Sequence, residues 1–149
     1  TLIVVLILMS LLTDKLDHEL ENAERNQFEL RLAELRSAVL LQEGMLVAKD
    51  QMDQAFRYEG ANPMVWMEPE ASYYLGEMNL ESVVGQAGNW VYDPRRKVIA
   101  YKTKTNVLLT EKDASESKWL QFKVVALLSN DKGNLIATGL RLKPVENEQ

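Results

Sequence analysis

The feature that most constrains this chain is a long stretch near its start that contains almost nothing to stop a helix. Residues 14–58 contain no Pro and a single Gly, Gly44, and consist largely of helix-forming residues. No stop signal separates them from residues 1–13, so one continuous helix is expected, with a break near Gln27 or Gly44 as the alternative. At about 1.5 Å per residue, 58 residues would reach roughly 85 Å. Such a helix is too long to be enclosed in one compact domain of 149 residues.

Residues 1–13 carry no charge and are apolar at almost every position. As a helix they span roughly 20 Å, less than the hydrocarbon core of a bilayer, which is about 30 Å thick. We expect a truncated transmembrane anchor; a buried core helix or the apolar part of a signal peptide is the alternative. The acidic residues that follow favour an extracytoplasmic position for the rest of the chain. The expected anchor residues are Leu2, Ile3, Val4, Val5, Leu6, Ile7, Leu8, Met9, Leu11 and Leu12.

Residues 14–58 have the periodicity of an amphipathic helix, because apolar residues recur at spacings of three, four and seven. The apolar stripe is narrow at first and broadens after Val39, which indicates a helix that is exposed in its first half and buried in its second. A coiled-coil dimer is the alternative, although the heptads are few and irregular. The residues expected to pack against the rest of the protein are Phe28, Leu32, Leu35, Val39 and Leu46.

Helix-ending signals at Gly60 and Asn62-Pro63 open a connecting region, residues 59–88. Its aromatic residues, Trp66, Tyr73 and Tyr74, are interpreted as anchors that tie this region to a larger core. A sugar or ammonium site is the less favoured interpretation of the same cluster.

From residue 89 to 143 the pattern changes to that of β-strands, with Trp90 and Tyr92 as further anchors. Turn residues at 93–96 and 129–134 predict two hairpins, with a loop at 103–118 that includes a candidate short strand at 107–109. The predicted fold is therefore α+β: a long N-terminal helix packed on a small antiparallel sheet of about four strands, because the helix offers the apolar surface that the sheet needs. Residues 144–149 are expected to be a frayed tail.

The composition argues against catalysis. The chain has no Cys and a single histidine, His18, so thiolate chemistry and histidine-based metal sites lack their residues. Residues 130–134 have oxygen-bearing side chains but not the ligand spacing of a calcium loop. We expect no enzyme activity, no cofactor, no metal and no small-molecule substrate.

The charge is unevenly distributed along the chain. Residues 14–60 carry eleven acidic and six basic side chains, whereas residues 61–149 carry eleven of each, so the whole net charge of −5 lies on the first part. An acidic chain is a poor partner for nucleic acid. A local basic patch beside Trp90, Tyr92 and Tyr101 is interpreted as a solvated hairpin edge, with an anionic lipid or an acidic partner left open; it comprises Arg95, Arg96, Lys97, Lys102 and Lys104.

The order of an apolar helix, an amphipathic continuation, a loop and a small sheet resembles the type IV pilin and pseudopilin family. Thr1-Leu2-Ile3 is similar to the start of that family's mature chains, and residues 32–39 are similar to the segment that enters the globular head. Residues 60–63, 74–77 and 88–93 look closest to pilin-like biogenesis proteins of the mannose-sensitive haemagglutinin (MSHA) pilus. Val4 stands where the family carries an acidic residue, so a minor pilin-like subunit and an accessory biogenesis protein are both consistent with the resemblance.

This resemblance implies a non-enzymatic component of a type IV pilus or a related secretion machine. It would be a single-pass protein of the inner membrane with its C-terminal domain in the periplasm, and its partners would be other pilus or pseudopilus subunits and inner-membrane assembly proteins. One alternative is an extracytoplasmic ligand-binding or sensing module on a membrane-anchored stalk, with a pocket around Trp66, Tyr73, Trp90 and Tyr101. Another is a scaffold that dimerises through its helix as a coiled coil.

Overall fold

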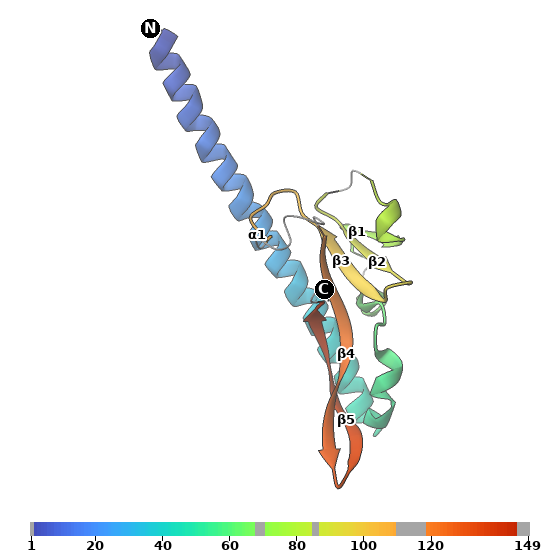
Figure 1. Ribbon diagram of the computed structural model, residues 1–149. Coiled ribbons are helices and arrows are strands. Elements are labelled where there is room, and N and C mark those ends of the chain that lie inside the picture. Colours follow the sequence, from blue (N-terminus) through green and yellow to red (C-terminus); the bar gives the residue numbers. More distant parts are fainter. Residues whose placement is uncertain (1, 68–70, 85–86, 110–118, 146–149) are drawn as a thin grey trace.

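The computed structural model describes residues 2–67, 71–84, 87–109 and 119–145. A helix of 47 residues, α1 (Leu2–Ala48), lies against a five-stranded sheet along its second half and projects beyond it with its first half (Figure 1). The strands are β1 (Tyr74–Glu77), β2 (Trp90–Asp93), β3 (Val98–Lys102), β4 (Trp119–Asp131) and β5 (Asn134–Pro144). Three short 3₁₀ helices join the helix to the strands: η1 (Met52–Tyr58), η2 (Pro63–Trp66) and η3 (Leu80–Ser82).

The helix α1 is continuous, so neither Gln27 nor Gly44 breaks it. The prediction that it runs to residue 58 is wrong, because it ends at Ala48. Asp50 adopts a left-handed conformation with φ of 55°, and the Gln51 amide donates to the Leu46 carbonyl at 2.8 Å. This bond across five residues is the usual way to close the last turn of a helix, but the left-handed residue is normally Gly. Because Asp50 and not a glycine occupies this position, the sequence shows no helix-ending signal there.

The sheet has five strands in the order β1-β2-β3-β4-β5. The prediction of an antiparallel sheet of about four strands is therefore wrong in the number of strands and, because β1 is parallel to β2, in part of the pairing. Both predicted hairpins are present: β2 pairs antiparallel with β3, and β4 with β5. The additional strand is β1, which lies in the region expected to be a connecting loop and pairs parallel with β2. Its four residues are too few to show an alternating pattern. Residues 107–109 form no strand, whereas Pro144, expected in the tail, is the last residue of β5.

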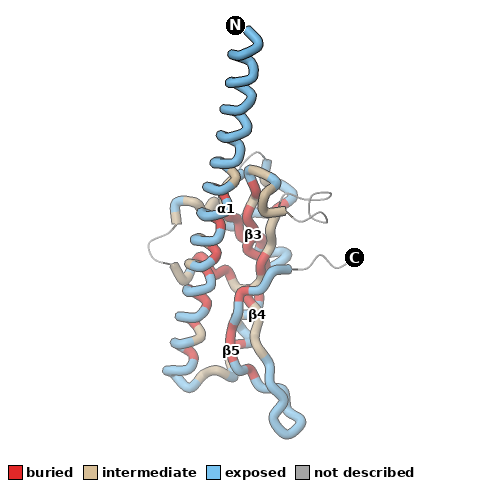
Figure 2. Tube along the Cα trace, turned by 90° about the vertical axis from the view of Figure 1, so that its left-hand side faces the viewer, coloured by how far each residue is buried: buried red, intermediate tan, exposed pale blue. Residues whose placement is uncertain are grey.

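The main core lies between α1 and one face of the sheet, as the α+β prediction required (Figure 2). The rings of Phe28 and Trp90 stack at a centroid distance of 5.7 Å, and Phe122 packs against both. A second, smaller cluster lies on the opposite face of the sheet and is covered by the η3 segment: it contains Leu80, Val91, Val98 and Ala100. Because both faces are covered there, all four residues of β2 are buried.

The predicted turn after β2 depends on Asp93, whose side chain is fully buried. Its carboxylate accepts hydrogen bonds from the backbone amides of Leu80, Arg95 and Arg96 at 2.8–3.1 Å. Burial raises the pKa of this carboxyl, but the three amides and the Arg96 guanidinium lower it by more, so its pKa lies below the ordinary value. Asp93 therefore closes the β2–β3 hairpin and also holds η3 against the sheet.

Candidate functional site

The first half of α1 is an exposed apolar helix. The ten expected anchor residues, Leu2 to Leu12 without Ser10, have 49–76% of their surface exposed. The helix surface remains exposed up to about Leu20, so this half contacts no other described part of the chain (Figure 2). Within the described residues, no helix combines the length and the apolar character that crossing a membrane requires.

The second half of α1 is fixed to the sheet. The structure places Phe28, Leu32, Leu35, Val39 and Leu46 in the main core, with exposed fractions of 8% or less. These positions recur on one face of the helix, which is the face that the apolar periodicity predicted. The same helix is therefore free at one end and a core element at the other.

The boundary between the two halves is formed by a buried carboxylate, Glu24. Glu24 Oε1 accepts a hydrogen bond from the Tyr101 hydroxyl at 3.0 Å and one from the Lys104 amide, while Oε2 accepts from the amide and hydroxyl of Thr105. Burial raises the pKa of Glu24, yet these four bonds outweigh it and leave the pKa below its ordinary value. The signal that could have found this residue is its spacing, since Glu24 lies four residues before Phe28, in phase with the buried stripe.

The four expected head anchors occupy different environments. Trp90 and Tyr92 are buried, and the Tyr92 hydroxyl donates to the Gly60 carbonyl at 2.5 Å. Tyr74 is half-buried and its hydroxyl accepts from the Asn62 amide at 2.8 Å. Trp66 is half-buried too and packs edge-on against Tyr58 at 6.0 Å. Tyr92 therefore joins the connecting region to the sheet, Tyr74 joins it to itself, and Trp66 packs it against η1.

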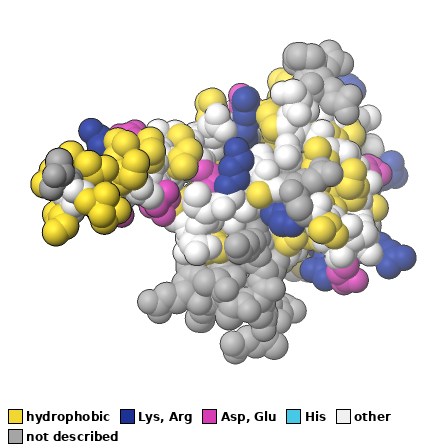
Figure 3. Space-filling view, turned by 90° about the horizontal axis from the view of Figure 1, so that it is seen from above, with side chains coloured by type: hydrophobic (Ala, Val, Ile, Leu, Met, Phe, Trp, Pro, Cys, Tyr) yellow, Lys and Arg dark blue, Asp and Glu magenta, His cyan; other side chains and the backbone are white. Residues whose placement is uncertain are grey.

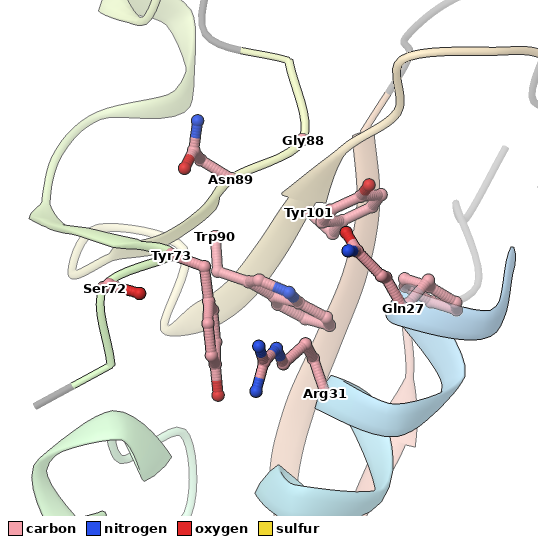
Figure 4. Close-up of a pocket in the computed structure, with 9 residues that line it drawn as sticks. Gln27, Arg31, Ser72, Tyr73, Gly88, Asn89, Trp90 and Tyr101 are labelled. Carbon is pink, nitrogen blue, oxygen red and sulfur yellow. The ribbon is translucent and has the colours of Figure 1, made fainter. Parts of the chain in front are cut away.

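A cavity of about 220 Å³ opens between α1, β2, β3 and the segments before β1 and β2 (Figure 4). Trp66 does not line it, although we expected that residue beside Tyr73, Trp90 and Tyr101. The volume is below the roughly 300 Å³ at which small-molecule sites usually begin. The lining residues are Gln27, Phe28, Arg31, Ser72, Tyr73, Gly88, Asn89, Trp90 and Tyr101.

Two features of this cavity concern its polar groups. Arg31 lies 4.3 Å from the centre of the Tyr73 ring, and both side chains bind Glu34, at 3.0 Å and 2.8 Å. Burial and the neighbouring Glu34 raise the pKa of Tyr73 to about 12, so its hydroxyl stays protonated and donates. Trp90 Nε1 is the one buried side-chain nitrogen or oxygen that has no hydrogen-bond partner within the described residues.

The other residues singled out in the sequence form no shared site. The rings of Trp90, Tyr92 and Tyr101 are buried, and Lys102 lies over a different ring, Trp119, at 5.5 Å. Residues 130–134 form the tight β4–β5 turn, in which Asn130 Oδ1 accepts from the Gly133 amide.

His18 is exposed beside Glu21, at 3.9 Å. The part of the chain described by the structure contains no cluster of acidic or histidine side chains arranged to hold a metal ion.

Comparison of the chain with protein-family models, with curated proteins and with solved structures found no significant match.

Proposed function

We propose that this protein is a membrane-held, non-enzymatic component of a type IV pilus-like machine or a related secretion system, and that it acts by association through its helix. The observation that carries the proposal is the exposed apolar half of α1. Ten large apolar side chains within the first twelve residues lie on all sides of a helix that contacts nothing else described. An apolar surface of this extent requires a covering surface, either lipid or the helices of partner proteins.

The geometry supports an assembly role rather than a simple anchor. The apolar segment is shorter than the hydrocarbon core of a bilayer is thick. Packing against other helices reduces the cost of this hydrophobic mismatch. Residues 13–23, which are mostly polar and mostly exposed, then separate this segment from the head, which Glu24 attaches to the helix. Together with the resemblance to pilins and pseudopilins, this favours an inner-membrane position with the head in the periplasm. Other pilus or pseudopilus subunits and inner-membrane assembly proteins would be its partners, with the protein acting as a minor pilin-like subunit or as an accessory biogenesis protein.

Fractionation of cells that express the full chain tests the membrane and helix parts of the proposal. The chain is expected in the membrane fraction, to be released by detergent but not by high salt. The double substitution Val5→Asp with Leu8→Asp should move most of it to the soluble fraction, because a charged side chain near the centre of an apolar helix costs about 3 kcal/mol. The matched control is Leu20→Asp, at a comparably exposed position outside the apolar segment, which should stay in the membrane fraction.

A soluble wild-type chain, or a double variant that stays in the membrane, would overturn this proposal. The partner class has a separate test: a photo-crosslinking residue at Leu8 should capture pilin-like subunits, and the same residue at Val65, which is exposed on the head, should not.

The cavity at Tyr73 and Trp90 favours a second candidate function, a small-ligand sensing module on the same stalk. The unpartnered Trp90 Nε1 donor is the specific observation for it. A ligand with a hydrogen-bond acceptor should shift the indole N–H resonance of Trp90 in the full-length protein. A resonance that no small carboxylate, sugar or amino acid moves would leave assembly as the function of the chain.

A further inference from the structure

The cavity beside Tyr73 and Trp90 contains a hydrogen-bond donor that its surroundings do not use. Trp90 is 1% exposed, its ring stacks on Phe28, and its Nε1 has no partner within the described residues. Buried N–H groups are nearly always paired with the protein or with an ordered molecule. In Figure 4 the amide of Gln27 and the guanidinium of Arg31 lie on two sides of the indole ring. Because Gln27 is exposed, its side chain is free to turn aside and open the way to the N–H.

Two carboxylates are bonded to residues that line this cavity, and the oxygens of both are occupied. Glu34 accepts two hydrogen bonds from Arg31 Nη1, at 3.0 and 3.1 Å, and one from the Tyr73 hydroxyl at 2.8 Å. Glu24 accepts the four hydrogen bonds described above. Neither carboxylate is therefore left to receive the indole N–H or to bind a cationic ligand.

Two basic side chains stand at the cavity. Arg31 lines it, and a guanidinium carries five N–H donors, of which only those on Nη1 bind Glu34. Lys104 lies against Gly88, a lining residue, with its Nζ 3.0 Å from the place that a Gly88 Cβ would occupy. No salt bridge involves Lys104 within the described residues. Figure 3 looks at this end of the head and shows dark blue Lys and Arg side chains close to where the stalk enters it.

We propose that this cavity binds a small carboxylate, whose oxygens accept hydrogen bonds from the Trp90 N–H and from Arg31, with the Lys104 ammonium at the rim. The inference rests on the second candidate function above and names the class of ligand for it. A carboxylate supplies only acceptors, which is what a site with unused donors and occupied acceptors lacks. A guanidinium also suits this group, because its planar fork of N–H donors matches two carboxylate oxygens.

Other classes of ligand fit this cavity less well. A cation would be repelled by Arg31, which already covers the Tyr73 ring at 4.3 Å from its centre. A sugar that stacks on an aromatic ring needs an open ring face, and Trp90 and Tyr101 are at most 4% exposed. The volume of about 220 Å³ far exceeds the roughly 10–15 Å³ that one water needs, but it limits the ligand to a few non-hydrogen atoms.

The indole N–H resonances of the full-length protein in detergent micelles test the proposal. The chain has three tryptophans, so Trp66→Phe and Trp119→Phe identify the signal of Trp90 by elimination. Sodium acetate is the probe, and sodium chloride at the same concentrations controls for ionic strength. Acetate should shift the Trp90 resonance saturably, with a Kd in the millimolar range, and should leave the other two in place. Acetamide has the same shape without the charge and should bind about tenfold more weakly.

Matched substitutions locate the charges that bind acetate. Lys104→Gln should weaken acetate binding several-fold. Lys102→Gln changes the net charge equally, but Lys102 lies over the Trp119 ring on the other face of the sheet, so binding should be unchanged. Arg31→Gln should abolish saturable binding, with unshifted resonances of the other two tryptophans as the sign that the head is folded.

A Trp90 resonance that a sugar or inorganic phosphate moves and acetate does not would overturn the carboxylate assignment and leave the sensing function standing. Equal binding of acetate and acetamide would overturn it as well, since the charge would then have no role. A resonance that shifts on Gln27→Leu but with none of these ligands would show that Gln27 is the partner of the indole N–H. That result would overturn both the inference and the sensing function, whereas the assembly function depends on the fractionation experiment alone.

Discussion

A single buried carboxylate decides where the helix stops being exposed and starts being part of the head. Glu24 is 5% exposed although it belongs to a polar stretch of α1. Its two oxygens accept four hydrogen bonds from Tyr101, Lys104 and Thr105, and this satisfies the charge inside the protein. The bonds connect residues that are about eighty positions apart in the chain, so they attach the loop after β3 to the helix.

Glu24→Gln should therefore destabilise the head by about 1–3 kcal/mol at pH 7, because the neutral amide is a weaker acceptor and introduces donors that have no partners. The folded protein lowers the pKa of Glu24 below the ordinary value of 4.5, so its ionised form stabilises the folded state above that pH. As the pH falls through the folded pKa this contribution is lost, and the difference between wild type and variant should shrink below about pH 4. Urea unfolding at a series of pH values measures it.

The matched control for this prediction is Glu29→Gln, on the exposed face of the same helix, which should change the stability by less than about 0.5 kcal/mol at any pH. Equal effects of the two substitutions at pH 7 would show that the Glu24 bonds do not stabilise the head.

At the scale of elements, α1 combines an ordinary helix pattern with two irregular features. Gly44 lies inside it, where no tertiary contact requires a glycine: a Cβ added there would meet no atom within 4 Å. Asp50 ends it in a conformation that Gly normally adopts. Gly60, by contrast, has φ of 67° and lies against Lys97, so the connection from η1 to the sheet needs it.

Gly44→Ala is expected to stabilise the protein by about 0.5–1 kcal/mol, because alanine restricts the unfolded chain and forms helix more readily. Gly60→Ala should destabilise it by more than that, since its Cβ would lie 2.6 Å from the Lys97 Cβ and the backbone is left-handed. Thermal unfolding of both variants beside the wild type gives the comparison. A Gly44→Ala variant of lower stability would mean that the helix is not regular at this point.

The whole molecule consists of a head with one main core and a helix that extends well beyond it (Figure 1). This shape separates two kinds of surface. The apolar segment is available to lipid or partner helices, and the surface of the head lies far from it along the same helix. An elongated shape of this kind places contacts at several levels along one axis, which suits a protein that associates with copies or relatives of itself.

Hydrogen exchange along α1 tests this shape in one experiment. At a detergent concentration that keeps one chain per micelle, amides of residues 14–22 should exchange orders of magnitude faster than those of residues 32–42, because only the latter lie against the sheet. Detergent should protect residues 2–12. Uniform protection from residue 14 to residue 42 would show that another part of the chain covers the stalk, contrary to the structure.

The sequence alone was enough to determine that a long helix opens the chain, although not where it ends, and also its buried face, both hairpins and the α+β class. Those features depend on local patterns: helix-forming composition, a repeat of three to four residues at Phe28, Leu32, Leu35 and Val39, and turn residues between β-rich runs. The functional proposal also begins from a local pattern, the uncharged start of the chain.

The tertiary structure alone decided the remaining features, because they depend on residues that are distant in the chain. The strand β1 pairs with β2 and has no periodicity of its own. Glu24 is buried only because Tyr101 and Thr105 arrive beside it, and Lys123 meets Lys143 only through the register of β4 and β5. Burial and charge proximity are properties of the packed chain, so a linear pattern identifies the residue types but not the places where they meet.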